Sequence, residues 1–342
     1  MRKPFLRMLA IGFLAAGYDA SATAQTPEQF YKGRQISLVV GLNPGGGFDA
    51  YARLITQYMP KYIPGQPSIV IRYMPGAGTI VAANYLYVRA PRDGSEIGLI
   101  SSDISIAPLV GNEAAKFDSR KFTWLGSADS DSIYCISWKG TPFTSFKDIL
   151  TREMIVGAAG RQMVNADNIL MDVVKAKLRI VKGYDGTAAL KLAAERGEIQ
   201  GWCGVGLLGV DGADSELVRS GTARIIGQVG YDKKTYLPNV PDIAAYVQSD
   251  DDRRLLDFIF SYVYMSRPFA APPDLPKDRV AVLRTAFEET LSDPELVARA
   301  AKSNVSIRLV KGEDIDAFIE DAYTTPKSVV ERATRIINQK DN

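Results

Sequence analysis

Residues 36–59 read ISLVVGLNPGGGFDAYARLITQYM, and this stretch decides the fold. Its first five residues are almost wholly apolar and rich in β-branched side chains, as in a strand that is buried on both faces. A glycine turn follows at 44–47. Apolar residues then recur with helical spacing, at Tyr51, Leu54, Ile55, Tyr58 and Met59. The stretch therefore predicts a strand, a tight turn and a helix.

The turn at 44–47 predicts a place for an anion. Unpaired backbone N–H groups at the start of a helix, together with the helix dipole, suit a carboxylate or a phosphate. Asp49 and Arg53 are four residues apart and are expected to pair along the helix. A tight turn without a ligand fits the loop equally well. A nucleoside triphosphate is excluded, because no Lys-Ser or Lys-Thr follows the glycines.

The chain up to about residue 229 continues this alternation of strand and helix. Strands are predicted at 68–74, 96–101, 133–138, 154–156, 179–182, 199–205 and 223–229. Helices are predicted at 79–88, 145–150, 165–176 and 187–196. Strands that alternate with helices of about ten residues form parallel βαβ units. Glycine-rich loops after the strands predict a binding edge in each of two units.

Beyond residue 231 the chain is expected to return to the first unit. The predicted elements are an aromatic strand at 260–265, helices at 277–291 and 294–302, a strand at 305–309 and one helix from 314 to about 337. Two α/β units joined by more than one crossing form a hinged clamshell. We assign residues 25–130 and 257–342 to a first lobe and 131–256 to a second. Each lobe is expected to be a mostly parallel sheet flanked by helices.

The first 24 residues have the pattern of a secretory signal. Arg2, Lys3 and Arg7 precede the apolar run Met8–Gly17, and Ala22-Thr23-Ala24 matches an A-x-A cleavage site. Because no cysteine lies near this site, a lipid anchor is not expected. The sequence predicts a protein that is exported to the periplasm and cleaved near Ala24.

Composition describes a soluble globular protein of 342 residues, with 46% hydrophobic and 23% charged residues. The net charge of +2 gives no argument for binding to nucleic acid or to an anionic membrane surface. Cys135 and Cys203 are the only cysteines, and both lie in predicted strands. The exported location permits a bridge between them. Two buried free thiols are the outcome we expect, since free cysteine packs readily in cores.

Residues 38–53, LVVGLNPGGGFDAYAR, resemble the opening motif of the extracytoplasmic solute receptors of tripartite tricarboxylate transporters, the Bug receptors. Matching features follow in the same order: YMPGAG at 73–78, APRDG at 90–94, LPNVPD at 237–242 and APP at 271–273. The resemblance covers essentially the whole mature chain and is strongest in the first third. It implies a two-lobed periplasmic binding protein fold of type II, with the ligand in the cleft between the lobes.

The sequence argues against the common catalytic systems. There is no histidine, which excludes Ser-His-Asp and Cys-His nucleophiles and His-ligated zinc sites. There is no G-x-S-x-G elbow and no pair of acids in a recognisable acid–base arrangement. Residues 204–209 match G-x-G-x-x-G, but no convincing long helix follows. We predict no catalytic residue, no metal site and no cofactor.

Loops of both lobes are expected to bind the ligand. The resemblance implies that backbone groups and waters at the first-lobe glycine loops hold a carboxylate. The second lobe departs from the family, because GRQMVN at 160–165 and GVG at 204–206 replace its usual residues. The predicted ligand-binding residues are Pro44, Gly45, Gly46, Gly47, Phe48, Asp49, Gly76, Ser102, Asp103, Gly160, Arg161, Gln162, Asn165, Tyr184, Asp185, Gly186 and Val205.

For three of these side chains, the sequence allows two interpretations of their environment. Arg161, beside a helix start, is expected to bind a second carboxylate through two hydrogen bonds, and a solvated arginine at a loop tip fits as well. Phe48 and Tyr184 are expected to stack on a planar ligand in the cleft, although packing in the core or at the rim also fits.

The sequence therefore predicts a receptor that closes around a small organic carboxylate and hands it to the membrane subunits of a tripartite transporter. A dicarboxylate, an aromatic acid or an acidic amino acid fits as the ligand. A sensor that signals to a membrane kinase is an alternative from the same fold. A secreted enzyme that uses carboxylates such as Asp49, Asp103 or Asp185 is a more distant one.

Overall fold

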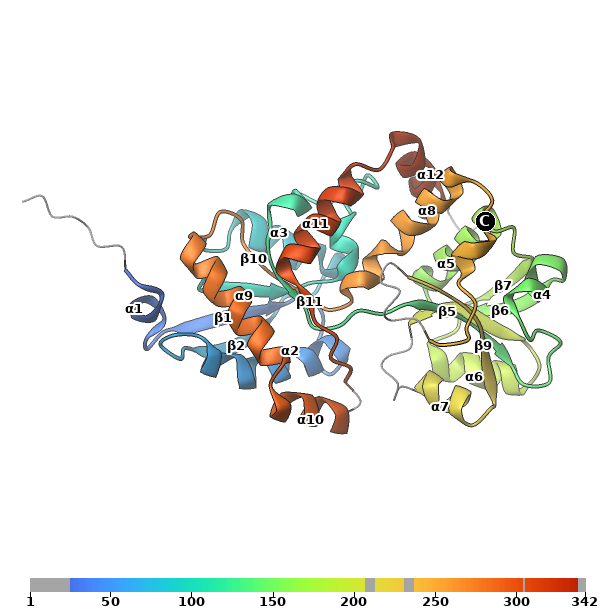
Figure 1. Cartoon of the computed structure of the whole chain (residues 1–342), viewed down its shortest axis with the longest axis horizontal. Coiled ribbons are helices and arrows are strands. Elements are labelled where there is room, and N and C mark those ends of the chain that lie inside the picture. Colours follow the sequence, from blue (N-terminus) through green and yellow to red (C-terminus); the bar gives the residue numbers. More distant parts are fainter. Residues whose placement is uncertain (1–24, 207–212, 231–236, 304, 338–342) are drawn as a thin grey trace, which may run out of the picture.

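The computed structural model describes residues 25–206, 213–230, 237–303 and 305–337. It has two lobes, each built on one β-sheet (Figure 1). The expected signal segment 1–24 and the last glycine of the 204–209 motif lie outside the described residues. Within the described ranges, no helix has the length and apolar character needed to cross a membrane.

The first lobe contains a six-stranded sheet in the order β11-β4-β10-β3-β1-β2. Its strands are β1 (Gln35–Val40), β2 (Ser68–Tyr73), β3 (Glu96–Leu99), β4 (Thr123–Ser127), β10 (Pro268–Ala271) and β11 (Val310–Lys311). β1 pairs in parallel with β2 and β3, as expected. β10 and β11 add antiparallel pairs, because they belong to the part of the chain that returns from the second lobe. The sheet is therefore mixed.

Helices cover both faces of this sheet. One face carries α1 (Pro27–Tyr31), α2 (Gly47–Tyr58), α9 (Lys277–Leu291) and α10 (Pro294–Lys302), and the other carries α3 (Ile80–Val88) and α11 (Gly312–Tyr323). Side chains of β1 alternate between the two layers: Leu38 and Val40 pack under α2, and Val39 packs on the opposite side. All three are fully buried, which confirms the strand buried on both faces.

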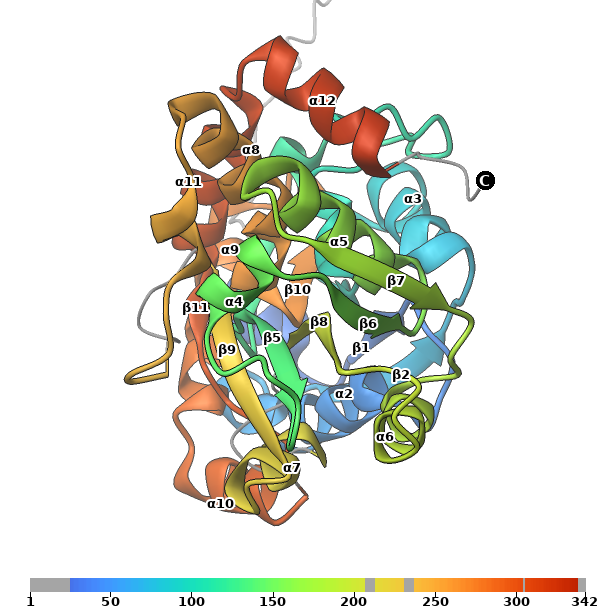
Figure 2. The ribbon, with the colours of Figure 1, turned by 90° about the vertical axis from the view of Figure 1, so that its right-hand side faces the viewer.

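The second lobe contains a five-stranded mixed sheet in the order β7-β6-β8-β5-β9 (Figure 2). Its strands are β5 (Ile133–Trp138), β6 (Met154–Ala158), β7 (Leu178–Lys182), β8 (Gly201–Gly206) and β9 (Ala223–Val229). Its helices are α4 (Phe146–Thr151), α5 (Arg161–Val173), α6 (Thr187–Glu195), α7 (Ala213–Arg219) and α8 (Asp250–Phe260). α4, α5 and α8 contribute to one hydrophobic layer, and α6 and α7 to the other.

The aromatic segment 260–265 is not a strand. α8 ends at Phe260, a 3₁₀ turn spans Ser261–Met265, and the returning strand is β10. Its side chains divide between the lobes as consecutive pairs: Tyr262 and Val263 pack in the core of the second lobe, and Tyr264 and Met265 in that of the first. The segment is a passage from one lobe to the other.

The C-terminal part also differs from its prediction. The single helix expected from 314 to 337 is two helices, α11 and α12 (Lys327–Ile337), because Pro326 disfavours helical backbone in the residue before it. The strand expected at 305–309 does not form, and the short strand β11 follows at Val310–Lys311. α12 packs on α5 and α8, where Arg332 forms ion pairs at 2.6 Å with Asp172 and Asp252. It therefore lies on the second lobe (Figures 1 and 2), in contrast to the assignment of 257–342 to the first.

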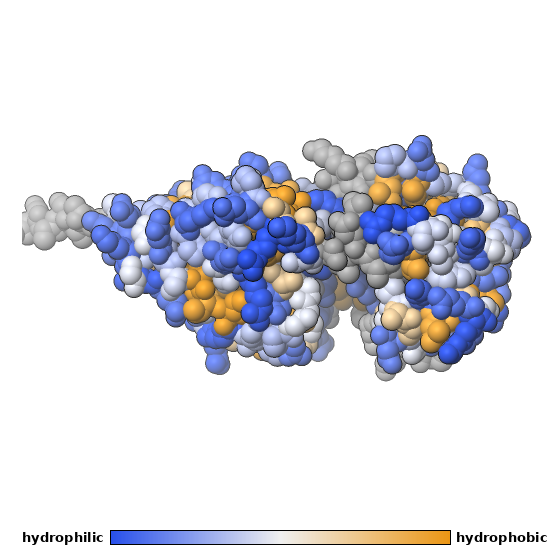
Figure 3. All heavy atoms as spheres, turned by 90° about the horizontal axis from the view of Figure 1, so that it is seen from below, coloured by the Kyte–Doolittle hydropathy of each residue, from blue (hydrophilic) through white to orange (hydrophobic). Residues whose placement is uncertain are grey.

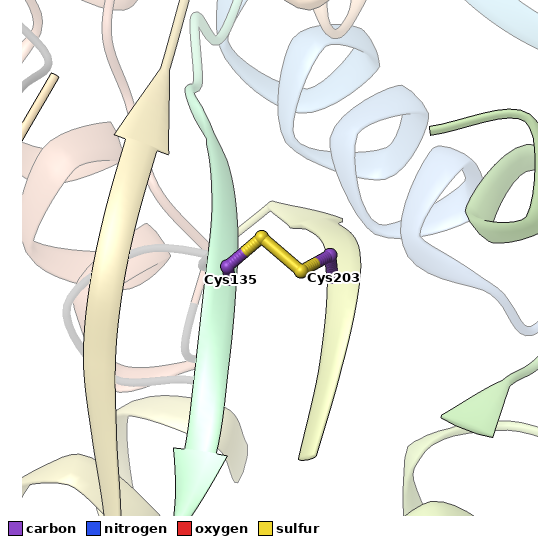
Figure 4. The surroundings of a disulfide bond; sticks show 2 residues. All are labelled: Cys135 and Cys203. Atoms are coloured by element: carbon purple, nitrogen blue, oxygen red, sulfur yellow. A yellow bond between two sulfur atoms is a disulfide. The ribbon is translucent and has the colours of Figure 1, made fainter. Parts of the chain in front are cut away.

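Cys135 and Cys203 form a disulfide that joins β5 to β8 (Figure 4). The two residues are direct partners in the antiparallel register, with Cα atoms 4.0 Å apart. The expectation of two free thiols is therefore wrong. Strands that are separated by 68 residues become neighbours in the sheet, which hydrophobic periodicity does not specify.

α5 buries one carboxyl group, that of Asp167. Its side chain is fully buried, and neither oxygen has a hydrogen-bond partner among the described residues. Burial raises the pKa of Asp167 well above its usual value, because the charged form is disfavoured away from water. The folded protein therefore retains this proton at pH values where the unfolded chain has lost it.

We predict that replacing both cysteines, Cys135→Ala with Cys203→Ala, lowers the free energy of unfolding by roughly 2–5 kcal/mol, because the bond restricts the unfolded chain. Urea denaturation followed by circular dichroism measures the difference. Dithiothreitol should lower the midpoint of the wild type to that of the double variant and leave the variant unchanged. Equal midpoints for all samples would contradict the disulfide.

We predict that Asp167→Asn removes a pH dependence of stability. The folded pKa is raised, so the stability from the neutral acid is complete below the unfolded value of about 3.9 and is lost as pH rises towards the folded value. The variant should gain on the wild type by up to about 1.4 kcal/mol per pH unit above about pH 4. Urea titrations across this range test it, with Asp251→Asn, an exposed acid, as control. A gain that does not change with pH would contradict the buried acid.

Candidate functional site

A cavity of about 340 Å³ lies between the two lobes. The space-filling view shows the molecule hollowed between the lobes (Figure 3). Loops and strand ends of both lobes line this cavity: Ser102, Asp129, Asp131, Ile133, Ala159, Gln162, Met163, Gly186, Thr187, Gly204, Val205, Gly206, Tyr262, Val263, Ser266 and Arg267. The position fits the general rule that α/β proteins bind ligands where strands end.

A second cavity of about 670 Å³ adjoins the first. Ser102, Gln162 and Tyr262 line both, and Gln162 Nε2 donates a hydrogen bond of 2.8 Å to Tyr262 Oη where the two meet. Much of the remaining wall is apolar and comes from Ile106, Val110, Ile169, Ile259 and Phe260. The two cavities form one interlobe space. We call the smaller cavity, which Asp129, Asp131 and Arg267 line, its polar end; the larger cavity combines apolar side chains with polar ones such as Asp103 and Asn165.

The floor of the polar end consists of two crossing segments, 127–132 and 263–267, that connect the lobes. Backbone hydrogen bonds hold them side by side: Asp131 N donates to Val263 O at 3.0 Å, Ser266 N to Asp129 O at 2.9 Å, and Ala128 N to Arg267 O at 3.0 Å. These bonds fix the backbone positions from which the aspartate and arginine side chains enter the cavity.

Arg267 provides a cation at this floor. Its guanidinium lies over the rings of Phe48 and Tyr51, at 5.0 and 5.3 Å from their centroids. Nη1 donates to Ser266 O at 2.7 Å, whereas Nη2 makes no hydrogen bond to a described residue. Arg267 is therefore held in place by aromatic rings and can donate to an anion.

Asp129 and Asp131 line the same cavity, but their carboxylates differ in the partners that they contact. Asp129 accepts a hydrogen bond of 3.2 Å from Tyr51 Oη, and Arg308 Nε lies 3.5 Å from its other oxygen. Asp131 has only the backbone N–H of Ser132, at 2.8 Å. Burial raises the pKa of Asp131 to about 7, and the charge of Asp129 adds to this shift. Asp131 is therefore the acid that lacks a cation.

The second lobe presents two helix starts to the cavity. α5 begins at Arg161 after Gly160, and α6 begins at Thr187 after Gly186; neither glycine provides a side-chain cap. Their first backbone N–H groups and the positive ends of their dipoles suit a carboxylate. α5 starts four residues before its predicted start, so Arg161 stands on the first helical turn and not at a loop tip. The Arg161 side chain lies outside the described residues.

The glycine loop at 44–49 supports the site and does not line it. The Asp49 carboxylate accepts hydrogen bonds from Gly45 N at 2.9 Å, from Arg53 Nε at 3.0 Å and from Tyr73 Oη. Burial alone would raise the pKa of Asp49, but these hydrogen bonds lower it overall. The expected pairing with Arg53 is confirmed. Because Asp49 is fully engaged, it fixes the turn that places Phe48 beneath Arg267.

The structure brings together part of the predicted set. Ser102, Gln162, Gly186 and Val205 line the smaller cavity, and Ser102, Asp103, Gln162 and Asn165 line the larger one. Pro44, Gly45, Gly46, Gly47, Phe48, Asp49, Gly76, Gly160, Tyr184 and Asp185 are not among the residues that line either cavity. Tyr184 packs on the hydrophobic layer of the second lobe that contains Leu190, in line with the packing alternative left open for it.

Sequence reasoning missed Asp129, Asp131, Tyr262 and Arg267. The first two lie in the polar run DSDS between two strands, which was a visible signal, since a polar run at a crossing between lobes reaches the cleft. Arg267 follows a segment that was read as a strand, so its approach to Phe48 had no local signal. Among the described residues, no cluster of acids, cysteines and histidines could hold a metal ion.

Comparison with known proteins gives a match at the level of structure. No family model and no curated protein matches the sequence. A TctC solute-binding protein from Polaromonas, solved without ligand, is 19% identical over 88% of this chain and 99% of its own, with a TM-score of 0.70. MatC from Rhodopseudomonas palustris, solved with malate, is 18% identical over 88% and 99%, with a TM-score of 0.58.

Another R. palustris protein, solved with adipate, is 19% identical over 88% of this chain and 97% of its own, with a TM-score of 0.59. At such identities the likeness concerns the fold. This chain has the two-lobed fold of the periplasmic solute-binding proteins, with one mixed sheet in each lobe.

Proposed function

We propose that this chain is an exported receptor that encloses a small organic carboxylate between its lobes and delivers it to the membrane subunits of a tripartite transporter. The observation that carries the proposal is the polar end of the interlobe space, where Arg267 and the starts of α5 and α6 face one cavity. A carboxylate there gains charge-assisted hydrogen bonds and a favourable interaction with both helix dipoles.

Ligand binding is expected to close the two lobes, because the groups that contact the ligand belong to different parts of the molecule. Arg267 belongs to the crossing floor, whereas the helix starts belong to the second lobe and Ser102 to the first. A ligand that contacts all of them binds the closed arrangement better than an open one, and so shifts the population towards closure. The proposed cycle requires no chemical reaction.

Two further observations support the ligand class and the destination. Two of the solved structures with this fold contain malate and adipate, both dicarboxylates. The motif at 38–53 resembles that of receptors for tripartite transporters, and the pattern of residues 1–24 supports export to the periplasm.

The test uses the exported protein purified from the periplasm. It is unfolded in urea with its disulfide intact, refolded to remove carried-over ligand, and screened by thermal shift against mono-, di- and tricarboxylates and their neutral amides. A ligand at 100 times its dissociation constant adds about 2.7 kcal/mol to the free energy of unfolding, which gives a clear shift. We expect shifts with carboxylates only. Shifts with neutral amides alone would overturn the ligand class.

A variant tests the site itself. Arg267→Gln should weaken the best carboxylate at least about tenfold in calorimetry, because a hydrogen bond to a charged group contributes about 1.5–3 kcal/mol. Arg92→Gln is the matched control, since Arg92 is an exposed arginine whose partner is Asp274. Equal affinities of the two variants would show that Arg267 does not contact the ligand.

A further inference from the structure

Asp131 presents an unsatisfied carboxylate oxygen to the interlobe cavity. Its side chain is 6% exposed and lines the 340 Å³ cavity. Oδ1 accepts the hydrogen bond from Ser132 N, whereas Oδ2 accepts none from any described residue. Because Asp131 lines the cavity, a donor that enters the cavity can reach this oxygen.

The neighbouring cations are engaged elsewhere. Arg308 approaches Asp129 and donates to Ser306 Oγ at 3.1 Å. Arg267 lies on its two aromatic rings and donates to Ser266 O. Both arginines lower the pKa of Asp131 from a distance, but burial outweighs them, and no described cation forms an ion pair with it. Asp131 thus remains an acid without a counter-charge.

The end of β8 makes room for this carboxylate. A Cβ atom at residue 206 would collide with Oδ2 and Cγ of Asp131. The backbone of Gly206 is not in the left-handed region, so glycine is needed here for space and not for conformation. The carboxylate therefore lies directly against the strand end, beside the cavity that β8 helps to line.

The interlobe space carries more acid than base. Of the described side chains that line the two cavities, Asp103, Glu113, Asp129 and Asp131 are acidic, and Arg267 alone is basic. A simple dicarboxylate would bring its second negative charge close to unpaired acids, which disfavours binding. A ligand that also carries a positive group would supply the missing charge.

We propose that Asp131 binds a cationic amino group of the ligand, so that the solute is an amino-bearing carboxylate held by its two opposite charges. The inference rests on the proposed function for the carboxylate end, which lies at Arg267 and the starts of α5 and α6. The amino group donates to Asp131 Oδ2 within the cavity, where the burial of this carboxylate strengthens its attraction to an opposite charge. Asp131 thereby selects among carboxylates.

Matched pairs of acids test this assignment on the refolded exported protein. Calorimetry compares succinate with aspartate, glutarate with glutamate, propanoate with alanine, and butyrate with 4-aminobutyrate. We expect at least one amino acid to bind ten times more tightly than its partner without the amino group. Equal or tighter binding of the partner in every pair would overturn the assignment and leave the carboxylate receptor intact.

Variants connect the preference to Asp131. Asp131→Asn should remove the preference for the amino member while leaving the affinity for its partner unchanged or increased. Gly206→Ala should reduce the same preference, because the added Cβ atom displaces the Asp131 carboxylate. This variant retains the aspartate and provides a second test if Asp131→Asn does not fold. Asp251→Asn, at an exposed acid that lines neither cavity, is the control and should keep the preference. A preference that persists in both Asp131→Asn and Gly206→Ala would overturn the assignment.

Butylamine separates this inference from the proposed function. An amine that binds as tightly as 4-aminobutyrate would overturn the carboxylate receptor and support the amino subsite. Binding of 4-aminobutyrate without binding of butylamine or butyrate supports both. If no acid and no amine in the set binds, both proposals fail.

Discussion

The hydrogen bonds between the two crossing segments are the constraint on which the site depends. Segments 127–132 and 263–267 come from distant parts of the chain, and each connects a strand or helix of one lobe to the other lobe. Their pairing gives both lobes a common floor. Arg267 and Asp131 have fixed backbone positions because of it, so a positive and a negative group face one cavity before any ligand enters. Such preorganisation reduces the entropy lost on binding.

The glycine turn that characterises the sequence acts one layer away from this floor. Asp49 binds the turn to β2 through Tyr73 and to α2 through Arg53, and the turn in turn positions Phe48. The rings of Phe48 and Tyr51 then support the guanidinium of Arg267. The motif therefore holds in place an arginine from another part of the chain.

This arrangement explains which features the sequence could predict. The strand at 36–40, the turn and the helix after it depend on local periodicity, and the structure confirms them. The approach of Arg267 to Ser127 joins residues 140 positions apart, and the disulfide joins strands whose register no local pattern encodes. Segment 260–265 was misread because aromatic and β-branched residues are typical of a strand, whereas here consecutive side chains pack into the cores of two different lobes. Long-range pairing, and not local propensity, determined what was missed.

The position of α12 has a consequence for how the lobes move. In the described chain, connections between the lobes occur near 127–133, 260–268 and 323–327, and the last of these leads into a helix bound to α5 and α8 through Arg332. Two adjacent connections alone act as a flexible ribbon that permits both bending and torsion. A third connection lies away from these two. If the lobes twisted against each other, its short backbone would have to stretch. This attachment is expected to resist torsion between the lobes more than opening of the cleft.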